Sequence, residues 1–373
     1  MFSNIFNYFS YYQWWKSLDK FILSLIAMLF FFGLFFSLVS TSLIAADKLD
    51  TNSYFFFFKH LGFLSIGFVL IFIFSYMDKR TLYKLSIYIF FLSFLLLFLV
   101  PIIGIEVKGS KRWLDLIFLP RIQPIEIVKP FFIIILSLII SYEKLSGYIT
   151  KFSFSLILTV LIAILLLIQP DLGQTLIIGF SWLILIFISG INLLLLGLVA
   201  IIGISFLLYA TFYIPKFEYI KNRLLSFFNS ETGSYNFQSD KAIESIISGG
   251  FFGKGIGEGT LKNRVPEAHT DYIISVISEE FGVIAIILIL FLFLFFIFSI
   301  LKKVRKETDD KIRLILVGSS SLILLQAMIH IGVNIRLFPT TGMTLPFLSY
   351  GGSLIISISI MSGIILNLTK RRI

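Results

Sequence analysis

The chain has 373 residues, of which 58% are hydrophobic and only 14% are charged, and it contains 44 phenylalanines. This is too apolar for a soluble protein of the same size, and several runs exceed the roughly 18 residues that a membrane-spanning helix requires. The lack of cysteine excludes a disulfide framework, a thiolate metal site and a cysteine nucleophile. No small-residue cleavage site follows a short apolar core at the N-terminus, so we expect a retained first span and no removable signal peptide.

The net charge of +10 raises the question of a nucleic-acid partner. In a membrane protein, Lys and Arg collect in cytoplasmic loops, where they face anionic lipid headgroups. We therefore expect no nucleic-acid partner.

The apolar runs predict an all-α, polytopic membrane protein with about ten transmembrane helices in a single membrane domain over residues 1–373. The predicted spans lie near residues 20–45, 55–77, 84–104, 124–141, 153–169, 172–189, 191–213, 272–301, 313–338 and 343–368. The predicted order is a cytoplasmic N-terminus (1–19), spans one to seven (20–213), a large extracytoplasmic loop (214–270), spans eight to ten (271–369) and a cytoplasmic tail (370–373). Residues 214–229 have the pattern of an amphipathic helix lying on the membrane surface.

The charges of the short loops predict the orientation. The basic segments 77–84, 142–151, 302–313 and the tail from Lys370 alternate so that all lie on the cytoplasmic side, and an even number of spans places both termini there. Residues 106–130 and 214–270 also carry several Lys and Arg, although they fall on the opposite side. An anionic ligand would explain these charges; the alternative is that the loops simply tolerate them.

Two polar motifs precede the middle of the chain. In "KGSKRWLDL", Lys108, Lys111 and Arg112 suit pyrophosphate oxygens, and equally suit ordinary lipid headgroups. In "QPIEIVKP", Glu126 and Lys129 share a helix face within the membrane, where charges mark either function or pairing. Lys129 could therefore bind substrate or neutralise a carboxylate.

A third motif, "QPDLGQT", joins spans five and six. Asp171 fits a helix N-cap, and Gly173 permits close helix approach, so the motif is mostly structural. The alternative is that the acidic cap faces a pore or binds a metal.

The stretch "RVPEAHTDYIISVISEEFG" places Asp271 at the start of span eight, at the water boundary. The positive end of a helix favours an ionised carboxylate, which could accept a proton from a sugar hydroxyl; a plain N-cap is the alternative. Glu279 and Glu280 lie about 12 Å deeper along the helix. We predict that one of them forms an ion pair with Lys129. The glycine-rich stretch from Gly249 predicts irregular backbone whose amides could face a phosphate, although it matches neither the phosphate-loop nor the dinucleotide-binding pattern.

The stretch "NIRLFPTTGMTLPFLSYGGS" links spans nine and ten. Pro346 and the pair Gly351–Gly352 predict a broken span ten, and broken backbone is stable in a membrane only beside protein or a cavity. We therefore expect a cavity on the outer side with Arg336 at its rim.

Together these motifs, in this order and spacing, resemble the SEDS family of bacterial cell-shape and division proteins over nearly the whole chain. The resemblance implies a ten-span peptidoglycan glycosyltransferase that polymerises lipid II, works with a class B penicillin-binding protein transpeptidase and other division-complex proteins, and lies in the bacterial inner membrane at the septum. "PEAHTD" and "GVNIRLFPTTGMTLPF" resemble the division branch most and the elongation branch second. Ile125 and Leu354 replace the usual serines of two motifs.

The resemblance implies Asp271 as the catalytic residue. The implied substrate-binding residues are Lys111, Arg112, Gln123, Glu126, Lys129, His269, Thr270, Arg336, Ser349 and Tyr350. No cofactor is certain and no metal-ligand set stands out, although Mg2+ or Mn2+ could shield a departing pyrophosphate. The alternatives are a lipid II flippase, the elongation polymerase of the same family, and a scaffold for division proteins.

Overall fold

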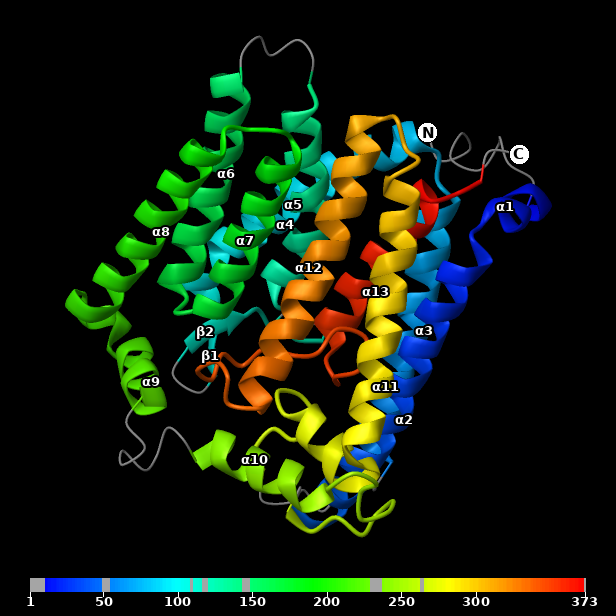
Figure 1. Cartoon of the computed structure of the whole chain (residues 1–373), viewed down its shortest axis with the longest axis vertical. Helices are drawn as coiled ribbons and strands as arrows, with labels where there is room; N and C mark the ends of the chain where they lie inside the picture. Colours follow the sequence, from blue (N-terminus) through cyan, green and yellow to red (C-terminus); the bar gives the residue numbers. More distant parts are fainter. Residues whose placement is uncertain are drawn as a thin grey trace.

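The computed structural model describes residues 11–48, 54–107, 110–115, 120–142, 148–228, 237–261 and 265–371. The predicted all-α membrane fold is confirmed: the described chain is mostly helical and contains ten long helices (Figure 1). Their bounds are α2 (Lys20–Lys48), α3 (Phe55–Tyr76), α4 (Lys79–Ile103), α5 (Pro124–Ile140), α6 (Tyr148–Ile168), α7 (Leu172–Ile188), α8 (Leu193–Tyr213), α11 (Ile273–Val304), α12 (Asp310–Asn334) and α13 (Gly352–Leu368). Seven of these described helices are long and apolar enough to cross a membrane.

Shorter elements complete the described structure. They comprise a short helix before α2, a hairpin between α4 and α5, and three helices between α8 and α11. They are α1 (Tyr11–Ser17), β1 (Ile105–Val107) antiparallel to β2 (Ser110–Trp113), η2 (Pro215–Phe217), α9 (Glu218–Phe228) and α10 (Phe237–Gly249). The amphipathic helix predicted over residues 214–229 is therefore η2 and α9. The predicted large loop thus contains substantial helix.

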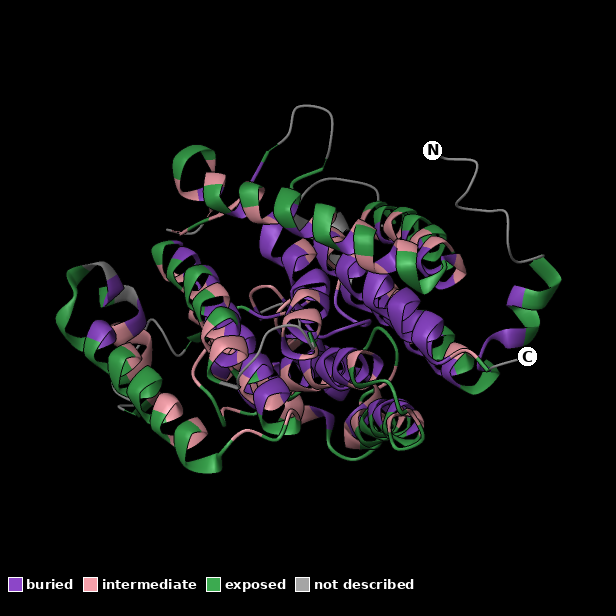
Figure 2. Cartoon of the chain, turned by 90° about the horizontal axis from the view of Figure 1, so that it is seen from above, coloured by how far each residue is buried: buried purple, intermediate pink, exposed green. Residues whose placement is uncertain are grey.

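Burial separates central helices from peripheral ones. α5 and α13 are buried along nearly their whole length, whereas α8 buries only Ala210 and Thr211 and otherwise exposes many leucine, isoleucine and aromatic side chains. Figure 2 shows buried residues gathered in the middle of the bundle and exposed residues on its outer helices. An apolar helix that stays exposed is stable only in lipid. The burial pattern therefore agrees with a multi-pass membrane protein whose core lies around α5 and α13.

Three central helices are unusually short. α5, α7 and α13 each have 17 residues, which corresponds to about 25 Å of helix, against a hydrocarbon core of about 30 Å. Span ten was predicted from residue 343, but α13 begins only at Gly352, because Pro346 and the glycine pair interrupt the helix. All three helices begin at the same end of the bundle, opposite the two chain ends (Figure 1). Irregular backbone fills part of the space that longer helices would occupy.

The basic loops gather at the end that holds the chain ends. Lys303 Nζ, at the end of α11, lies 2.5 Å from Asp19 Oδ2, just before α2. The Arg371 amide donates to the carbonyl of Ser17 over 2.8 Å, and Asn367 Nδ2 donates to that of Phe74 over 2.7 Å. The segments predicted to share one side of the membrane therefore lie together, except that residues 143–147 lie outside the described structure.

Helix α11 contains a break at Gly282. This residue has φ +78° and ψ 176°, so its backbone is not helical, although helix continues on both sides. A Cβ atom at this position would lie 2.1 Å from the Phe251 carbonyl oxygen. Only glycine fits this conformation and this close approach. The break brings the glycine-rich segment that follows α10 against α11.

Candidate functional site

A cavity of about 880 Å³ opens at the first turns of the short helices α5, α7 and α13, at the end of the bundle away from the chain ends. Its lining includes the first turns of three helices, through Glu126 of α5 and its N-cap Gln123, Gln174 of α7 and Gly352 of α13. Asp271, just before α11, also lines it. Helix N-termini carry partial positive charge and free amide groups. The floor of this cavity is therefore suited to a negatively charged ligand.

Two half-buried arginines strengthen this positive field. Arg112, on β2, lines the cavity with its Nε 3.6 Å from Asp171 Oδ2 and its guanidinium 2.5 Å from the Pro170 carbonyl. Arg223, on α9, lines the same cavity and donates to the Thr340 carbonyl over 3.0 Å. Burial, and then the nearby charge of Arg112, lower the pKa of Arg223 to about 10, so it remains a cation at neutral pH. Two arginine forks facing one cavity match the oxygens of a phosphate or diphosphate.

Asp271 is held by backbone contacts from two directions. Glu267 has φ +55°, and its carbonyl accepts hydrogen bonds from the amides of Thr270, Asp271 and Tyr272. From the other side, Asn334 Nδ2 donates to the Asp271 carbonyl over 3.0 Å. The tight turn and this contact fix the backbone from which the carboxylate projects. A Cβ atom built on Gly342 would lie 3.6 Å from Asp271 Oδ2, so the carboxylate faces the segment that lines the cavity wall.

The charges around Asp271 act in opposite directions on the neighbouring Tyr272 hydroxyl. Burial, and then the negative charge of Asp271, raise the pKa of the neighbouring Tyr272 hydroxyl well above its ordinary value. Arg223 acts in the opposite direction on that hydroxyl. Tyr272 therefore stays protonated at neutral pH, and Asp271 and the cationic Arg223 line the same cavity.

One face of α12 fixes the irregular segment between α12 and α13. Gln326, His330 and Asn334 are spaced four residues apart and are all buried. Gln326 Nε2 donates to the Thr344 carbonyl over 3.0 Å, and His330 Nδ1 lies 2.7 Å from the Met343 carbonyl. These contacts replace the hydrogen bonds that the broken backbone would otherwise lack.

The position of Lys129 corrects one prediction. Its Nζ is fully buried and contacts Glu126 Oε1 at 2.7 Å and Gln326 Oε1 at 2.9 Å, instead of Glu279 or Glu280. One turn separates Lys129 from Glu126 on α5, so the nearer carboxylate satisfies the ammonium without a contact to α11. Of the two uses considered for Lys129, the structure supports neutralisation of a carboxylate.

Glu279 and Glu280 instead hold the glycine-rich segment. Glu279 Oε1 accepts from the Leu261 amide over 2.8 Å and lies 3.6 Å from Lys254 Nζ. Glu280 Oε2 accepts from the Gly257 amide over 2.5 Å. Carboxylates bound to backbone amides are stable where burial would otherwise be costly. This pair therefore orders residues 249–261 beside the break at Gly282.

The cavity gathers some of the residues implied by the resemblance and leaves out others. Those that line it are Arg112, Gln123, Glu126, Thr270, Asp271 and Tyr350; Lys111, Lys129, His269, Arg336 and Ser349 are not in its lining. Lys108 lies outside the described residues.

Each residue outside the lining has another contact or position. Arg336 was expected at the cavity rim, but its Nη1 lies 2.8 Å from Asp240 Oδ1 on α10. His269 packs with Phe56 and Tyr350 at ring-centroid distances of 5.6 and 5.8 Å. Ser349 Oγ donates to the Thr270 carbonyl over 2.7 Å, so its contact supports the turn before Asp271. Lys111 is exposed on β2.

Sequence reasoning missed several residues of the cavity. These are Lys59, Arg121, Gln174, Arg223 and Glu267. Gln174 could have been found, because it lies three residues after Asp171, on the first turn of the same helix. Arg223 lies within the predicted amphipathic helix, but nothing in that pattern shows that the helix turns one arginine toward Asp271.

Comparison with known proteins agrees with this architecture. A family model described as "Cell cycle protein" and named for FtsW, RodA and SpoVE matches residues 19–372. The chain belongs to this family. A relative in Caulobacter vibrioides, named "Probable peptidoglycan glycosyltransferase FtsW", is 32% identical over 363 residues, covering 96% of this chain and 91% of the relative. A Bacillus subtilis relative of the same name is 31% identical over 370 residues, covering 95% of this chain and 91% of its own length.

Solved structures share the fold of this family member. A chain from a peptidoglycan synthase complex, described as coordinating polymerization and crosslinking, aligns with a TM-score of 0.76 at 24% identity, covering 95% of this chain and 98% of that one. The rod shape determining protein RodA of Thermus thermophilus aligns with a TM-score of 0.69 at 25% identity, covering 95% and 97%. The similarity extends over the whole membrane bundle.

Proposed function

We propose that this protein is a peptidoglycan glycosyltransferase that polymerises lipid II during septal cell-wall synthesis. The observation that carries the proposal is one cavity in which an aspartate carboxylate, two half-buried arginines and three helix N-termini meet. Relatives named as probable peptidoglycan glycosyltransferases, about one-third identical over nearly the whole chain, support the same activity.

In the proposed reaction, Asp271 takes the proton from the acceptor sugar hydroxyl. The freed oxygen forms a bond to the anomeric carbon of the growing chain. The bond from that carbon to the lipid diphosphate breaks, and its electron pair leaves with the diphosphate oxygen. Arg112, Arg223 and the helix N-termini stabilise the charge that develops on this leaving group. A single displacement inverts the configuration at the anomeric carbon.

A divalent cation is part of the proposal rather than of the described site. Within the ranges that the structure describes, no three His, Asp or Glu side chains gather as a metal-binding group. Asp271 and Glu267 are carboxylates lining the cavity. With the diphosphate oxygens of the substrate, they would face an Mg2+ or Mn2+ ion that shields the departing charge.

Transport of a lipid-linked precursor is the less favoured alternative. Lys129, Phe131 and Phe132 of α5 are fully buried beneath the cavity. A flippase would need this packing to open across the membrane. The cavity walls, by contrast, already hold the charges that glycosyl transfer requires.

The proposed setting follows from the charge distribution. The end with the basic loops and both chain ends would lie in the cytoplasm, and the cavity would open outside, because positive loops remain inside. We further propose a septal location and a class B penicillin-binding protein as the crosslinking partner, together with other membrane proteins of the division complex. The elongation polymerase of the same family differs from this proposal in location rather than chemistry.

The deciding experiment is glycan polymerisation by the purified protein with lipid II and its partner transpeptidase in detergent. We expect Asp271→Asn to abolish polymer while the protein remains folded. Arg223→Gln should lower the rate by roughly a hundredfold, because one preorganised donor to developing charge is removed. Lys221→Gln, on the same helix but outside the cavity lining, is the matched control and should stay active.

Three outcomes would contradict the proposal. Full polymerisation by Asp271→Asn would remove the carboxylate from the reaction. Lipid II movement across vesicles without polymer would favour the flippase. Normal division in cells that carry only Asp271→Asn would favour the scaffold.

A further inference from the structure

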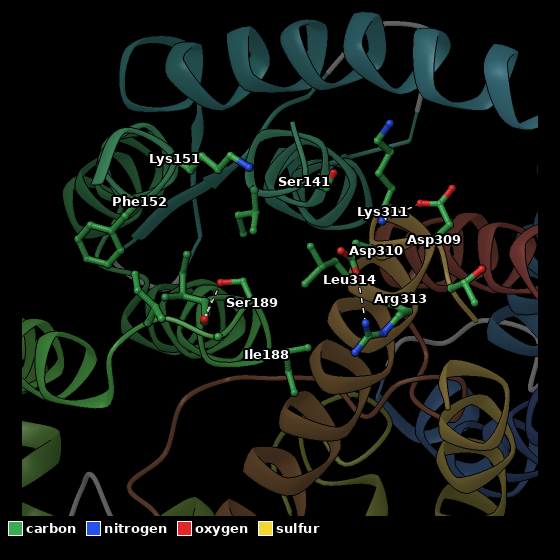
Figure 3. A pocket seen from close by; sticks show the side chains of 15 residues that line it. Ser141, Lys151, Phe152, Ile188, Ser189, Asp309, Asp310, Lys311, Arg313 and Leu314 are labelled. Atoms are coloured by element: carbon green, nitrogen blue, oxygen red, sulfur yellow. Dashed lines mark hydrogen bonds and ion pairs between the residues drawn. The ribbon is translucent and has the colours of Figure 1, made fainter. Parts of the chain in front are cut away.

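A second cavity lies at the opposite end of the bundle. It has a volume of about 760 Å³ and is enclosed by the ends of α5 and α7 and the first turns of α6 and α12 (Figure 3). Since α5 and α7 have 17 residues each, this cavity lies about 25 Å from the candidate site along the helix axes. It is therefore separate from the site of the proposed reaction.

The lining of this second cavity combines apolar walls with a charged rim. The walls include Ile140, Phe152, Ile186 and Leu314, which are all buried. The rim carries hydroxyl groups, three cations and two carboxylates. These rim residues are Ser141, Lys151, Ser189, Thr308, Asp309, Asp310, Lys311 and Arg313. An amphiphilic ligand fits such a lining better than a purely polar one.

The charges on the rim are not all equally available. Arg313 Nη1 lies 2.9 Å from Asp310 Oδ1, and the Asp309 carboxylate accepts from the Lys311 amide over 2.9 Å as the N-cap of α12. Both aspartates are therefore engaged within their own helix. The amines of Lys151 and Lys311 make no hydrogen bond or ion pair with another residue in the described ranges, and Lys151 extends inward from α6 (Figure 3). Two cations remain for an anion.

We propose that this cavity binds the headgroup phosphate of an anionic glycerophospholipid from the leaflet at this end of the bundle. The cavity lies where several membrane helices begin or end, which is the level of lipid headgroups. Lys151 and Lys311 would contact the phosphate, and the apolar wall below them would contact the start of an acyl chain. Basic pockets between transmembrane helices bind anionic headgroups in this way. The inference does not depend on the proposed reaction or on which side of the membrane this end faces.

Binding of short-chain lipids to the purified full-length protein in detergent tests the proposal. The probes are dioctanoyl phosphatidylglycerol, dioctanoyl phosphatidylcholine and glycerol phosphate, measured by native mass spectrometry. We expect phosphatidylglycerol to bind most tightly and the double variant Lys151→Gln, Lys311→Gln to weaken it roughly tenfold or more. The charge-preserving pair Lys151→Arg, Lys311→Arg should retain binding.

A matched double variant controls for overall charge. Lys302→Gln with Lys306→Gln removes two exposed cations from the same end of the bundle, outside the lining of the cavity, and should leave binding unchanged. Equal weakening in both glutamine doubles would overturn the proposal, because general surface charge would then explain binding. Glycerol phosphate binding as tightly as phosphatidylglycerol would assign the site to a soluble phosphate compound instead. If the Lys151, Lys311 glutamine pair failed to fold, equal affinity for phosphatidylglycerol and phosphatidylcholine would still refute anion recognition.

Discussion

Lys129 shows how a single buried charge is stabilised in this protein. Its ammonium is fully enclosed and has two partners, Glu126 and Gln326, which come from α5 and α12. Glu126 in turn accepts from Gln174 Nε2 of α7 over 2.9 Å. A buried ion pair contributes little by itself, but the loss of one partner leaves an uncompensated charge. This network therefore makes the packing of α5, α7 and α12 depend on the pairing of Lys129 with Glu126.

The network gives a prediction about stability. We expect Lys129→Met to lower the free energy of unfolding by about 3 kcal/mol, because Glu126 would then be buried without its cation. The double variant Lys129→Met, Glu126→Gln should recover most of that loss. Thermal unfolding in detergent measures both, with the exposed Lys302→Met as control. A double variant as unstable as the single one would contradict the ion-pair explanation.

The sequence identified individual charges better than it identified their partners. The sequence predicted Asp271 at the water boundary and marked Glu126 as an intramembrane charge with either a function or a partner, because charges inside a membrane are costly. The structure brings both to the lining of one cavity. The partner of Lys129 was assigned by depth alone, and depth does not distinguish α11 from the next turn of α5. The sequence does not predict Arg223 as a cavity residue, because its position depends on how α9 packs beside the cavity, which is a property of the tertiary structure. By contrast, the spacing of Gln326, His330 and Asn334 is a signal that the sequence does contain.

At the scale of elements, breaks in helices shape the site more than the helices do. Ten long helices follow directly from apolar length, and most of their bounds agree with the predicted spans. Span ten differs because residues 335–351 leave the helix and cross the cavity wall, held by polar side chains of α12. Pro346 and the glycine pair predicted a break, but not its extent. The break in α11 at Gly282 also shapes its surroundings, since it lets the glycine-rich segment after α10 pack against α11.

The conformation of Gly282 predicts a selective effect of a small substitution. We expect Gly282→Ala to destabilise the protein by about 2 kcal/mol, because alanine at positive φ is strained and its Cβ would meet the Phe251 carbonyl. Gly197→Ala, in α8, is the control, since a Cβ there meets nothing within 4 Å. Thermal unfolding and the rate of proteolysis within residues 249–261 measure the change. Equal midpoints for the two variants would show that the break carries no strain.

At the scale of the whole molecule, charged side chains gather at the two ends of the helix bundle. One end holds the termini and the basic loops, together with the Asp19–Lys303 pair. Burial raises the pKa of Asp19, but Lys303 and backbone amides lower it further, so the net shift is below its ordinary value. The stability from this pair is therefore present above the ordinary carboxyl pKa and is lost as the pH falls through the lowered one. The other end holds the cavity with its arginines.

The absence of cysteine allows the proposed orientation to be tested directly. Single cysteines at two exposed positions, Lys306→Cys between α11 and α12 and Glu258→Cys beside α11, report the two ends of the bundle. With a membrane-impermeant maleimide and intact cells, we expect labelling at position 258 and protection at position 306 until the cells are opened. The reverse pattern would place the cavity in the cytoplasm and rule out the proposed setting.

The shortness of α5, α7 and α13 has a consequence for any lipid-borne sugar that enters the cavity. Each is about 5 Å shorter than the hydrocarbon core that a full-length span crosses. Under the proposed function, a diphosphate resting on them would stay at the depth of the surrounding glycerol backbones, and its polyprenyl tail would remain dissolved among acyl chains throughout. The protein would thus avoid extracting a long hydrocarbon into water, and the finished strand would lengthen outward while its carrier stayed in the bilayer.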